Sequence, residues 1–312
     1  MQKYLSKFSA QIALLTAVIS LSLTAIFIRI SLQEINVDAI LFNRLWLATL
    51  LFGMWSGVKQ FNFQKENTQS AYSGKAQVWD VGLLVAVGVA HLLGRLCWTW
   101  SLTQTSVANA NVLGALTPLF TTLGGWLLFK QYFDRRFLFG LLFAILGATT
   151  LGLEDLFKST NTFTGDGLAL VSSLFYAANF LIIEKLGKRF SVTTILLWRC
   201  TIGTLIMLPT VLIFEQQIFP ISVEGWIIIL CLAAICEFLG HGMVVYSLKY
   251  FSSGFVSLFL LLDPVIAAII AWILFSENLS LLNILGFAVI LEGIYLAKTG
   301  QGAEKELKES AV

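Results

Sequence analysis

Charged residues are scarce in this sequence. Asp, Glu, Lys and Arg make up 12% of the 312 residues, whereas 57% of the residues are hydrophobic. The charged fraction is about half of that usual in a soluble domain. No soluble fold of this length needs so much apolar surface, so the composition excludes a soluble globular protein and predicts a polytopic membrane protein.

Sequence signatures of several kinds of site are also missing. All four cysteines fall in apolar segments and lack metal-ligand spacing, so they are expected to pack as small hydrophobes: Cys97, Cys200, Cys231 and Cys236. No metal and no other cofactor is predicted. The pattern G-x-x-x-x-G-K-[ST] is absent, so transport driven by nucleotide hydrolysis would need a partner. The basic residues are spread over loops rather than gathered in one patch, which argues against binding to nucleic acid.

Apolar residues come in blocks of about twenty, the length that a helix needs to cross roughly 30 Å of hydrocarbon. The first block is interpreted as a retained helix rather than a cleaved signal peptide, because it is long and no small-residue cleavage site follows it. The blocks predict ten transmembrane helices: 11–30, 38–58, 79–101, 106–129, 136–153, 166–184, 192–214, 225–247, 253–275 and 281–298.

The positions of Lys and Arg predict the orientation in the membrane. Only Arg29 and Lys158 fall in loops on one side. Fifteen fall on the other: Lys3, Lys7, Lys59, Lys65, Lys75, Lys130, Arg135, Arg136, Lys185, Lys188, Arg189, Lys249, Lys298, Lys305 and Lys308. Both termini are therefore expected in the cytoplasm of a protein of the cell membrane, and segment 299–312 is expected to be a solvated, mobile tail.

The sequence repeats itself at an offset of 146 residues. When residue 91 is laid on residue 237, the two lines stay in register without a gap to residues 151 and 297, and identical pairs include Gly94/Gly240, Ser106/Ser252, Pro118/Pro264, Trp126/Trp272 and Gly140/Gly286. Upstream, "LFNRLW" at 41–46 resembles "LLWRCT" at 196–201, which places Arg44 opposite Arg199. We interpret residues 1–153 and 154–298 as two copies of a five-helix unit.

Because five is odd, the second copy enters the membrane from the opposite side. Two such copies are related by a pseudo-two-fold axis in the membrane plane. This inverted repeat is the architecture of secondary transporters, whose substrate site lies near the midplane between the copies.

Two segments carry a family resemblance. "LLDPVIAAIIAWILFSENLSLLNILGFAVILEGIYL" at 261–296 resembles the closing motif of the EamA branch of the drug/metabolite transporter (DMT) superfamily, and "ALTPLFTTLGGWLLF" at 115–129 is similar to its counterpart in the first copy. The resemblance implies an all-α membrane protein of ten helices in two inverted EamA-like repeats, a central cavity, and transport of amino acids or related small metabolites, often outward.

Ionisable residues inside the apolar segments are the first site candidates, since each costs about 3 kcal/mol at the bilayer centre. His91 and Glu237 occupy matching positions near the midplane, and Arg95 and His241 lie one turn further along their helices. We expect these four residues to line one path, with Trp98 on the same face of the helix as His91 and Arg95. The alternative is a closed network that only holds the two copies together.

Other polar residues at membrane depth leave more than one interpretation open. Arg44 and Arg199 lie near helix ends, so their side chains are expected to reach the headgroups or to form structural ion pairs. Asp263 precedes Pro264, at a kink that exposes backbone carbonyls. Neutral side chains that either contact substrate or hydrogen-bond between helices are Asn109, Asn111, Tyr176 and Asn179.

These residues predict a secondary transporter that exports small metabolites by alternating access. Amino acids or related zwitterions are the preferred cargo, with the carboxylate toward Arg95 and the ammonium toward Glu237. Exchange for a proton is part of the hypothesis, and its candidate carriers are Glu237, His241 and Asp263.

Three alternatives stand beside this hypothesis. A nucleotide-sugar or sugar-phosphate exchanger would present several cations to the phosphates. An intramembrane enzyme would need a nucleophile and base or a metal cluster, and two histidines on different helices fall short of that. A membrane scaffold or receptor would need no polar midplane. No catalytic residue is assigned.

Overall fold

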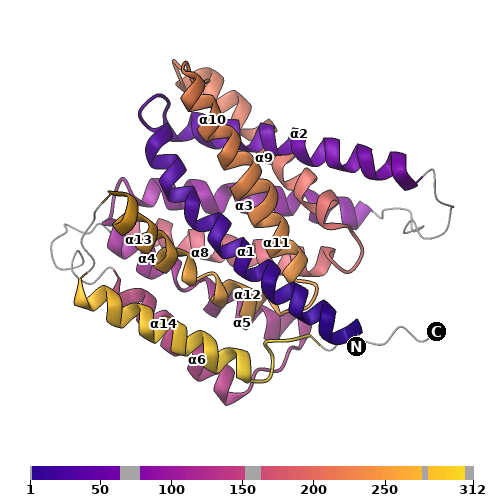
Figure 1. The fold of residues 1–312 in the computed structure, drawn as a ribbon, viewed down its shortest axis with the longest axis vertical. Coiled ribbons are helices and arrows are strands. Elements are labelled where there is room, and N and C mark those ends of the chain that lie inside the picture. The colour runs from indigo at the N-terminus through magenta and orange to yellow at the C-terminus, as the bar shows by residue number, and fades with distance from the viewer. Residues whose placement is uncertain (1, 64–77, 152–162, 276–279, 306–312) are drawn as a thin grey trace.

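The computed structural model describes residues 2–63, 78–151, 163–275 and 280–305, and these residues form helices with no strand. The helices are α1 (Gln2–Ser31), α2 (Val37–Phe63), α3 (Val78–Ser101), α4 (Val107–Gly114), α5 (Thr117–Phe129), α6 (Arg135–Thr150), α8 (Phe163–Leu186), α9 (Val192–Phe214), α10 (Val223–Cys231), η1 (Leu232–Gly240), α11 (His241–Ser247), α12 (Ser253–Phe259), α13 (Leu262–Phe275) and α14 (Leu281–Thr299). They pack as one bundle (Figure 1).

The ten predicted spans all correspond to described helices or consecutive helices. Nine segments of the described chain are long and apolar enough to cross a membrane. The tenth is α6, whose 16 residues cover most of the span predicted at 136–153. Residues 152 and 153 of that span lie outside the described residues. The predicted all-α architecture of two inverted five-helix repeats is confirmed.

Two predicted spans are broken helices, and the breaks fall at matching positions of the repeats. The first break separates α4 from α5 just before Pro118, and the second separates α12 from α13 just before Pro264. The starts match as well: Ser106 caps α4 by accepting from the backbone N–H of Asn109, and Ser252 caps α12 in the same way through Phe255. Paired broken helices of this kind mark the inverted repeats of transporters.

Helices α6 and α14, the last helix of each repeat, lie side by side at one edge of the bundle (Figure 1). Glycines let their backbones touch. A Cβ on Gly140 would lie 2.5 Å from the carbonyl oxygen of Gly293, and one on Gly293 would lie 2.6 Å from that of Gly140. Gly147 and Gly286 meet in the same reciprocal way, at 2.9 and 3.0 Å. Close backbone approach through small residues is a common basis of helix pairing in membranes.

The described part of the segment expected as a mobile tail, 299–312, differs from that expectation, and residues 306–312 lie outside the described residues. Its backbone bonds to the loop between α11 and α12: the Ser252 N–H donates to the Ala303 carbonyl at 3.0 Å, and the Lys305 N–H donates to the Tyr250 carbonyl at 2.8 Å. The Lys305 ammonium also lies 2.9 Å from the buried carboxylate of Glu184 at the end of α8. Residues 300–305 therefore form part of the folded bundle, because this loop and Glu184 supply partners for them.

Candidate functional site

Glu237 is the centre of a buried charged cluster. Its carboxylate accepts a hydrogen bond at Oε1 from Arg44 of α2 and one at Oε2 from Arg199 of α9, the latter at 2.9 Å. All three side chains are at most 1% exposed. Arg44 and Arg199 come from equivalent helices of the two repeats, so one carboxylate joins the two copies.

The local structure around Glu237 is unusual. Glu237 lies in η1, a π-helical stretch between α10 and α11 within one membrane span. A π-helical turn widens the backbone and displaces the following side chains around the helix axis, and such turns are frequent at functional sites. The π-helical stretch is thus a third irregularity in the membrane spans, besides the two helix breaks.

Three further side chains adjoin Glu237. His241 Nε2 lies 3.7 Å from Oε2 of Glu237. The ring of His91 stands nearly perpendicular to that of His241, at 5.5 Å between centroids, and its centroid lies 6.3 Å from that of the Tyr176 ring. The expected grouping of His91, Glu237 and His241 is therefore present, with Tyr176 beside it.

Arg95 is the cation of the cluster that no described residue neutralises by direct contact. It lies within electrostatic range of Arg44, Tyr176, Glu237 and Arg199. Its side chain is half-buried, and its Nε has no hydrogen-bond partner among the described residues. A buried guanidinium in this position is suited to bind a carboxylate, which matches its planar pair of donors.

The cluster carries more positive than negative charge. Three guanidinium groups, on Arg44, Arg95 and Arg199, surround the single carboxylate of Glu237, which leaves an excess of two positive charges when the histidines are neutral. Buried nitrogen atoms without a described partner include Nε of all three arginines and Nη1 of Arg44. Unpaired buried donors are rare in folded proteins, so the cluster is built to receive acceptor atoms.

The same residues do not favour a metal ion. One ligand atom each from His91, Glu237 and His241 can be chosen so that all lie within 4.8 Å of one another, and Nε2 of both histidines is unpaired among the described residues. Both oxygens of Glu237 already accept from arginines, however. A divalent cation would also add to the excess of positive charge, so the electrostatics of the cluster favour an anion.

Of the two roles expected for Arg44 and Arg199, the structure shows the ion pair. Neither side chain reaches the headgroups, because both turn inward to Glu237. Neither arginine is among the cargo-site residues that the sequence predicts. Their matching positions in the two repeats were the available signal, since residues equivalent by the pseudo-two-fold axis can meet where the axis passes.

The neutral candidates are placed in different surroundings. Asn179 donates to the carbonyl of Val87 at 2.8 Å and thereby joins α8 to α3. Asn109 donates to Asp166 at 3.3 Å, about ten residues or 15 Å along α8 from Tyr176. These bonds are the helix-to-helix use that the sequence left open. The structure shows no such bond for the exposed Asn111 or for Trp98, within the described part of the chain.

Asp263 lies outside the contacts of the arginine cluster. Its backbone carbonyl, at the kink before Pro264, accepts from the hydroxyl of Ser22 on α1 at 3.1 Å. A side-chain hydroxyl of α1 therefore bonds to the backbone of α13 beside the kink.

Comparison with known proteins identifies the class. The model of the EamA-like transporter family matches residues 8–153 and again residues 163–299. The chain therefore belongs to the EamA-like transporter family of the DMT superfamily, and it is a multi-pass membrane transporter by family.

Individual relatives have low sequence identity to this chain but match most of its length. An uncharacterized transporter of Archaeoglobus fulgidus is 24% identical over 281 residues, covering 88% of this chain and 92% of the relative. The pseudopaline exporter CntI of Pseudomonas aeruginosa is 24% identical over 71% of this chain and 77% of its own. A solved crystal structure with 14% identity superposes with a TM-score of 0.76, over 93% of this chain and 96% of the other, which shows the same fold.

Proposed function

We propose that this protein is a secondary transporter that exports small metabolites bearing a carboxylate, with amino acids and related zwitterions as the first candidates. One observation carries the choice of cargo: two buried guanidinium groups bond to one carboxylate, and a third, half-buried guanidinium lies within electrostatic range of them. An excess of buried positive charge is costly, and a bound carboxylate lowers that cost. A neutral or purely cationic cargo would not lower this cost.

The geometry supports an exchange of partners. Glu237 holds Arg44 and Arg199 together, while Arg95 is free to bind cargo. A carboxylate that enters at Arg95 competes with Glu237 for the arginines, and a released Glu237 becomes available to the cargo ammonium, to His241 or to a proton. Rocking of one repeat against the other would then alternate these pairings, which accounts for a proton-coupled exchange.

Two further observations support the proposed direction of transport and the proposed location. The fifteen Lys and Arg residues predicted on one side support an orientation with both termini in the cytoplasm of a cell-membrane protein. One relative is named as an exporter, which supports outward transport.

A phosphate-bearing cargo, such as a nucleotide sugar, is the second candidate. Arg44 and Arg199 raise the number of cations near the midplane to three, and several cations are what phosphate groups need. The first candidate is preferred because Glu237 already engages two of the three.

Efflux measurements test the proposal. Cells expressing the chain are loaded with radiolabelled amino acids, and loss of label is compared with cells expressing the Arg95→Gln variant at equal membrane abundance. Faster efflux of one or more amino acids with the wild type alone supports the proposal. Equal rates for every amino acid, together with efflux of labelled nucleotide sugars, would favour the second candidate.

A further inference from the structure

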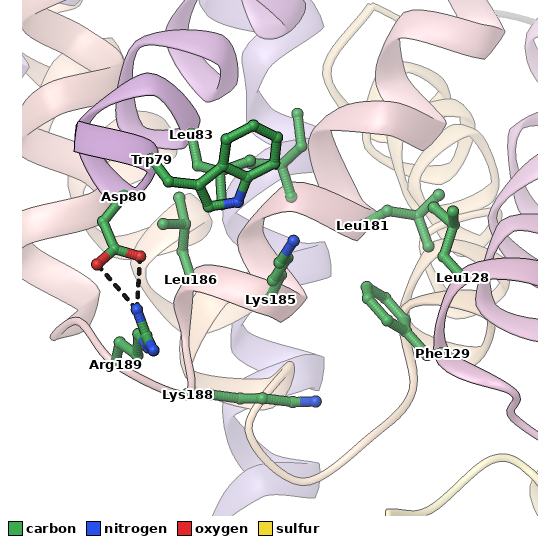
Figure 2. A pocket seen from close by; sticks show the side chains of 11 residues that line it. Trp79, Asp80, Leu83, Leu128, Phe129, Leu181, Lys185, Leu186, Lys188 and Arg189 are labelled. Atoms are coloured by element: carbon green, nitrogen blue, oxygen red, sulfur yellow. Dashed lines mark hydrogen bonds and ion pairs between the residues drawn. The ribbon is translucent and has the colours of Figure 1, made fainter. Parts of the chain in front are cut away.

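A cavity lies far from the charged cluster. It has a volume of about 570 Å³ and lies among the first turn of α3, the last turn of α5 and the end of α8 (Figure 2). Trp79 at its wall precedes His91 by twelve residues, or about 18 Å along α3. This cavity is therefore separate from the proposed cargo site.

Its walls are mainly apolar and open toward lipid. Leu83, Leu128 and Leu181 come from three different helices and line it together. Leu128 is 69% exposed and Trp79 is 68% exposed. In a membrane protein such exposed apolar side chains contact lipid, and Trp is enriched at the level of the headgroups. The cavity thus faces the bilayer at its polar boundary.

Two positive charges at this cavity have no carboxylate partner among the described residues. Arg189 is neutralised, because one of its nitrogens lies 2.9 Å from both carboxylate oxygens of Asp80. The Lys185 ammonium lies 5.6 Å from the centre of the Trp79 ring, and the Lys188 ammonium lies 5.5 Å from that of Phe129.

Figure 2 shows how these cations lie. Lys185 projects between Trp79 and Phe129, and Lys188 extends beneath Phe129. Both lysines are exposed, and the ammonium group of each lies near an aromatic ring of the cavity wall. The cavity therefore offers an apolar groove that ends at two unneutralised cations.

We propose that this cavity binds an anionic phospholipid of the leaflet that faces the basic loops. An acyl chain packs along Leu83, Leu128 and Leu181, and the phosphate binds between Lys185 and Lys188. Basic pockets between transmembrane helices are suited to anionic headgroups. A free phosphate would make no use of the apolar walls, and a zwitterionic lipid would add a cation beside two others.

Titration of the purified full-length chain in detergent tests the site. Phosphatidylglycerol or phosphatidylcholine is added, and the rise in the thermal unfolding midpoint gives the apparent affinity of each lipid. Phosphatidylglycerol is expected to bind more tightly. The variant Lys185→Gln/Lys188→Gln should weaken its binding roughly 30-fold, because each such cation contributes about 1 kcal/mol.

Two matched variants serve as controls. Arg136→Gln/Lys298→Gln removes the same charge from two exposed positions elsewhere at the same end of the bundle, and should leave the affinity unchanged. Lys185→Arg/Lys188→Arg should retain it. If the purified Gln variant does not fold, the Arg variant and a Leu83→Trp variant, which fills the groove, keep the test decisive, since Leu83→Trp must lower the affinity.

Three results would overturn the proposal. Equal affinity for the two lipids would mean an unselective groove. An equal stabilisation by inorganic phosphate would mean a phosphate site. Equal loss in the Arg136→Gln/Lys298→Gln control would mean attraction to the surface as a whole.

Discussion

The guanidinium of Arg199 lies 2.9 Å from Oε2 of Glu237, and neither side chain is more than 1% exposed. Arg44, the counterpart of Arg199 in the other repeat, bonds to Oε1 of the same carboxylate. A single anion thus joins equivalent helices of the two repeats. This arrangement makes Glu237 both a structural bridge and the group that an incoming carboxylate must compete with.

Loss of this carboxylate is expected to destabilise the protein. Glu237→Gln leaves the cluster without its anion, and breaking a buried pair costs about 3 to 5 kcal/mol. Thermal unfolding in detergent should show a clear fall in the midpoint, whereas Glu224→Gln, an exposed carboxylate at the start of α10, should change it little. Equal midpoints for the two variants would show that the ion pairs contribute nothing.

The same variant tests proton coupling. Reconstituted Glu237→Gln should still exchange labelled for unlabelled cargo, since exchange needs binding but no net proton release. It should lose the dependence of net transport on a pH gradient. If net transport by Glu237→Gln follows the gradient as in the wild type, Glu237 carries no proton and Asp263 is the next carboxylate to examine.

The contact between α6 and α14 predicts a steric effect at Gly147. A Cβ there would lie 2.7 Å from the backbone nitrogen of Ile290, so Gly147→Ala forces the two helices apart. Overpacking of this kind costs roughly 1 to 3 kcal/mol. Gly82→Ala in α3 is the control, because a Cβ there meets nothing within 4 Å and alanine favours the helix. The two variants should shift the unfolding midpoint in opposite directions; a shared direction would contradict the close contact.

Glu34 predicts an acid-dependent step in stability. Its carboxylate, in the loop between α1 and α2, accepts from the side chain and backbone of Ser222 and from the N–H of Ile221 at 3.0 Å. These hydrogen bonds lower the pKa of Glu34 below its ordinary value of 4.5. Since the folded pKa is depressed, the stabilisation is present above about pH 4.5 and is lost as the pH falls through the folded pKa.

Glu34→Gln measures this contribution. The variant should be less stable than the wild type at pH 6, and the difference should shrink as the pH approaches 3. Glu224→Gln again provides the exposed control. A constant difference between pH 6 and pH 3 would show that the Glu34 carboxylate is not the titrating group.

Orientation can be tested with single cysteines in a background that lacks the four native ones. Thr299→Cys, at the end of α14, should be shielded from an impermeant thiol reagent in intact cells and react once the membrane is opened. Gln33→Cys, in the loop after α1, should react from outside. The reverse pattern would invert the topology and place the proposed lipid site in the outer leaflet.

The ten spans and the repeat could be predicted because bilayer thickness sets the helix length and the matching prolines and serines keep register. The breaks in α4–α5 and α12–α13 had a signal in Pro118 and Pro264, yet hydropathy alone joins the halves into single spans. The π-helical stretch around Glu237 had no such signal in the sequence. Its residues are as apolar as those of the flanking helices, and only packing decides the backbone geometry.

The direction of a side chain was the main limit for the site. Arg44 and Arg199 lie close enough to helix ends for either headgroup contact or burial, and the rotation of each helix decides between the two. Asn109 and Asn179 posed the same problem, since a polar residue at membrane depth serves a neighbouring helix or a cavity equally well. Glu237, His91 and His241 were predictable because they lie too deep for their side chains to reach the membrane surface.

The most direct test of the proposed carboxylate site is counterflow in proteoliposomes. Uptake of a labelled amino acid identified by efflux is measured against unlabelled competitors: the same amino acid and its methyl ester, in the wild type, Arg95→Gln and Arg95→Lys. The free acid should compete and the ester should not. Arg95→Gln should weaken the apparent affinity roughly 10- to 100-fold, the range expected for a hydrogen bond to a charged group. The affinity of Arg95→Lys should lie between those of the wild type and Arg95→Gln. Equal competition by acid and ester, or unchanged affinity in a folded Arg95→Gln protein, would contradict carboxylate recognition by Arg95.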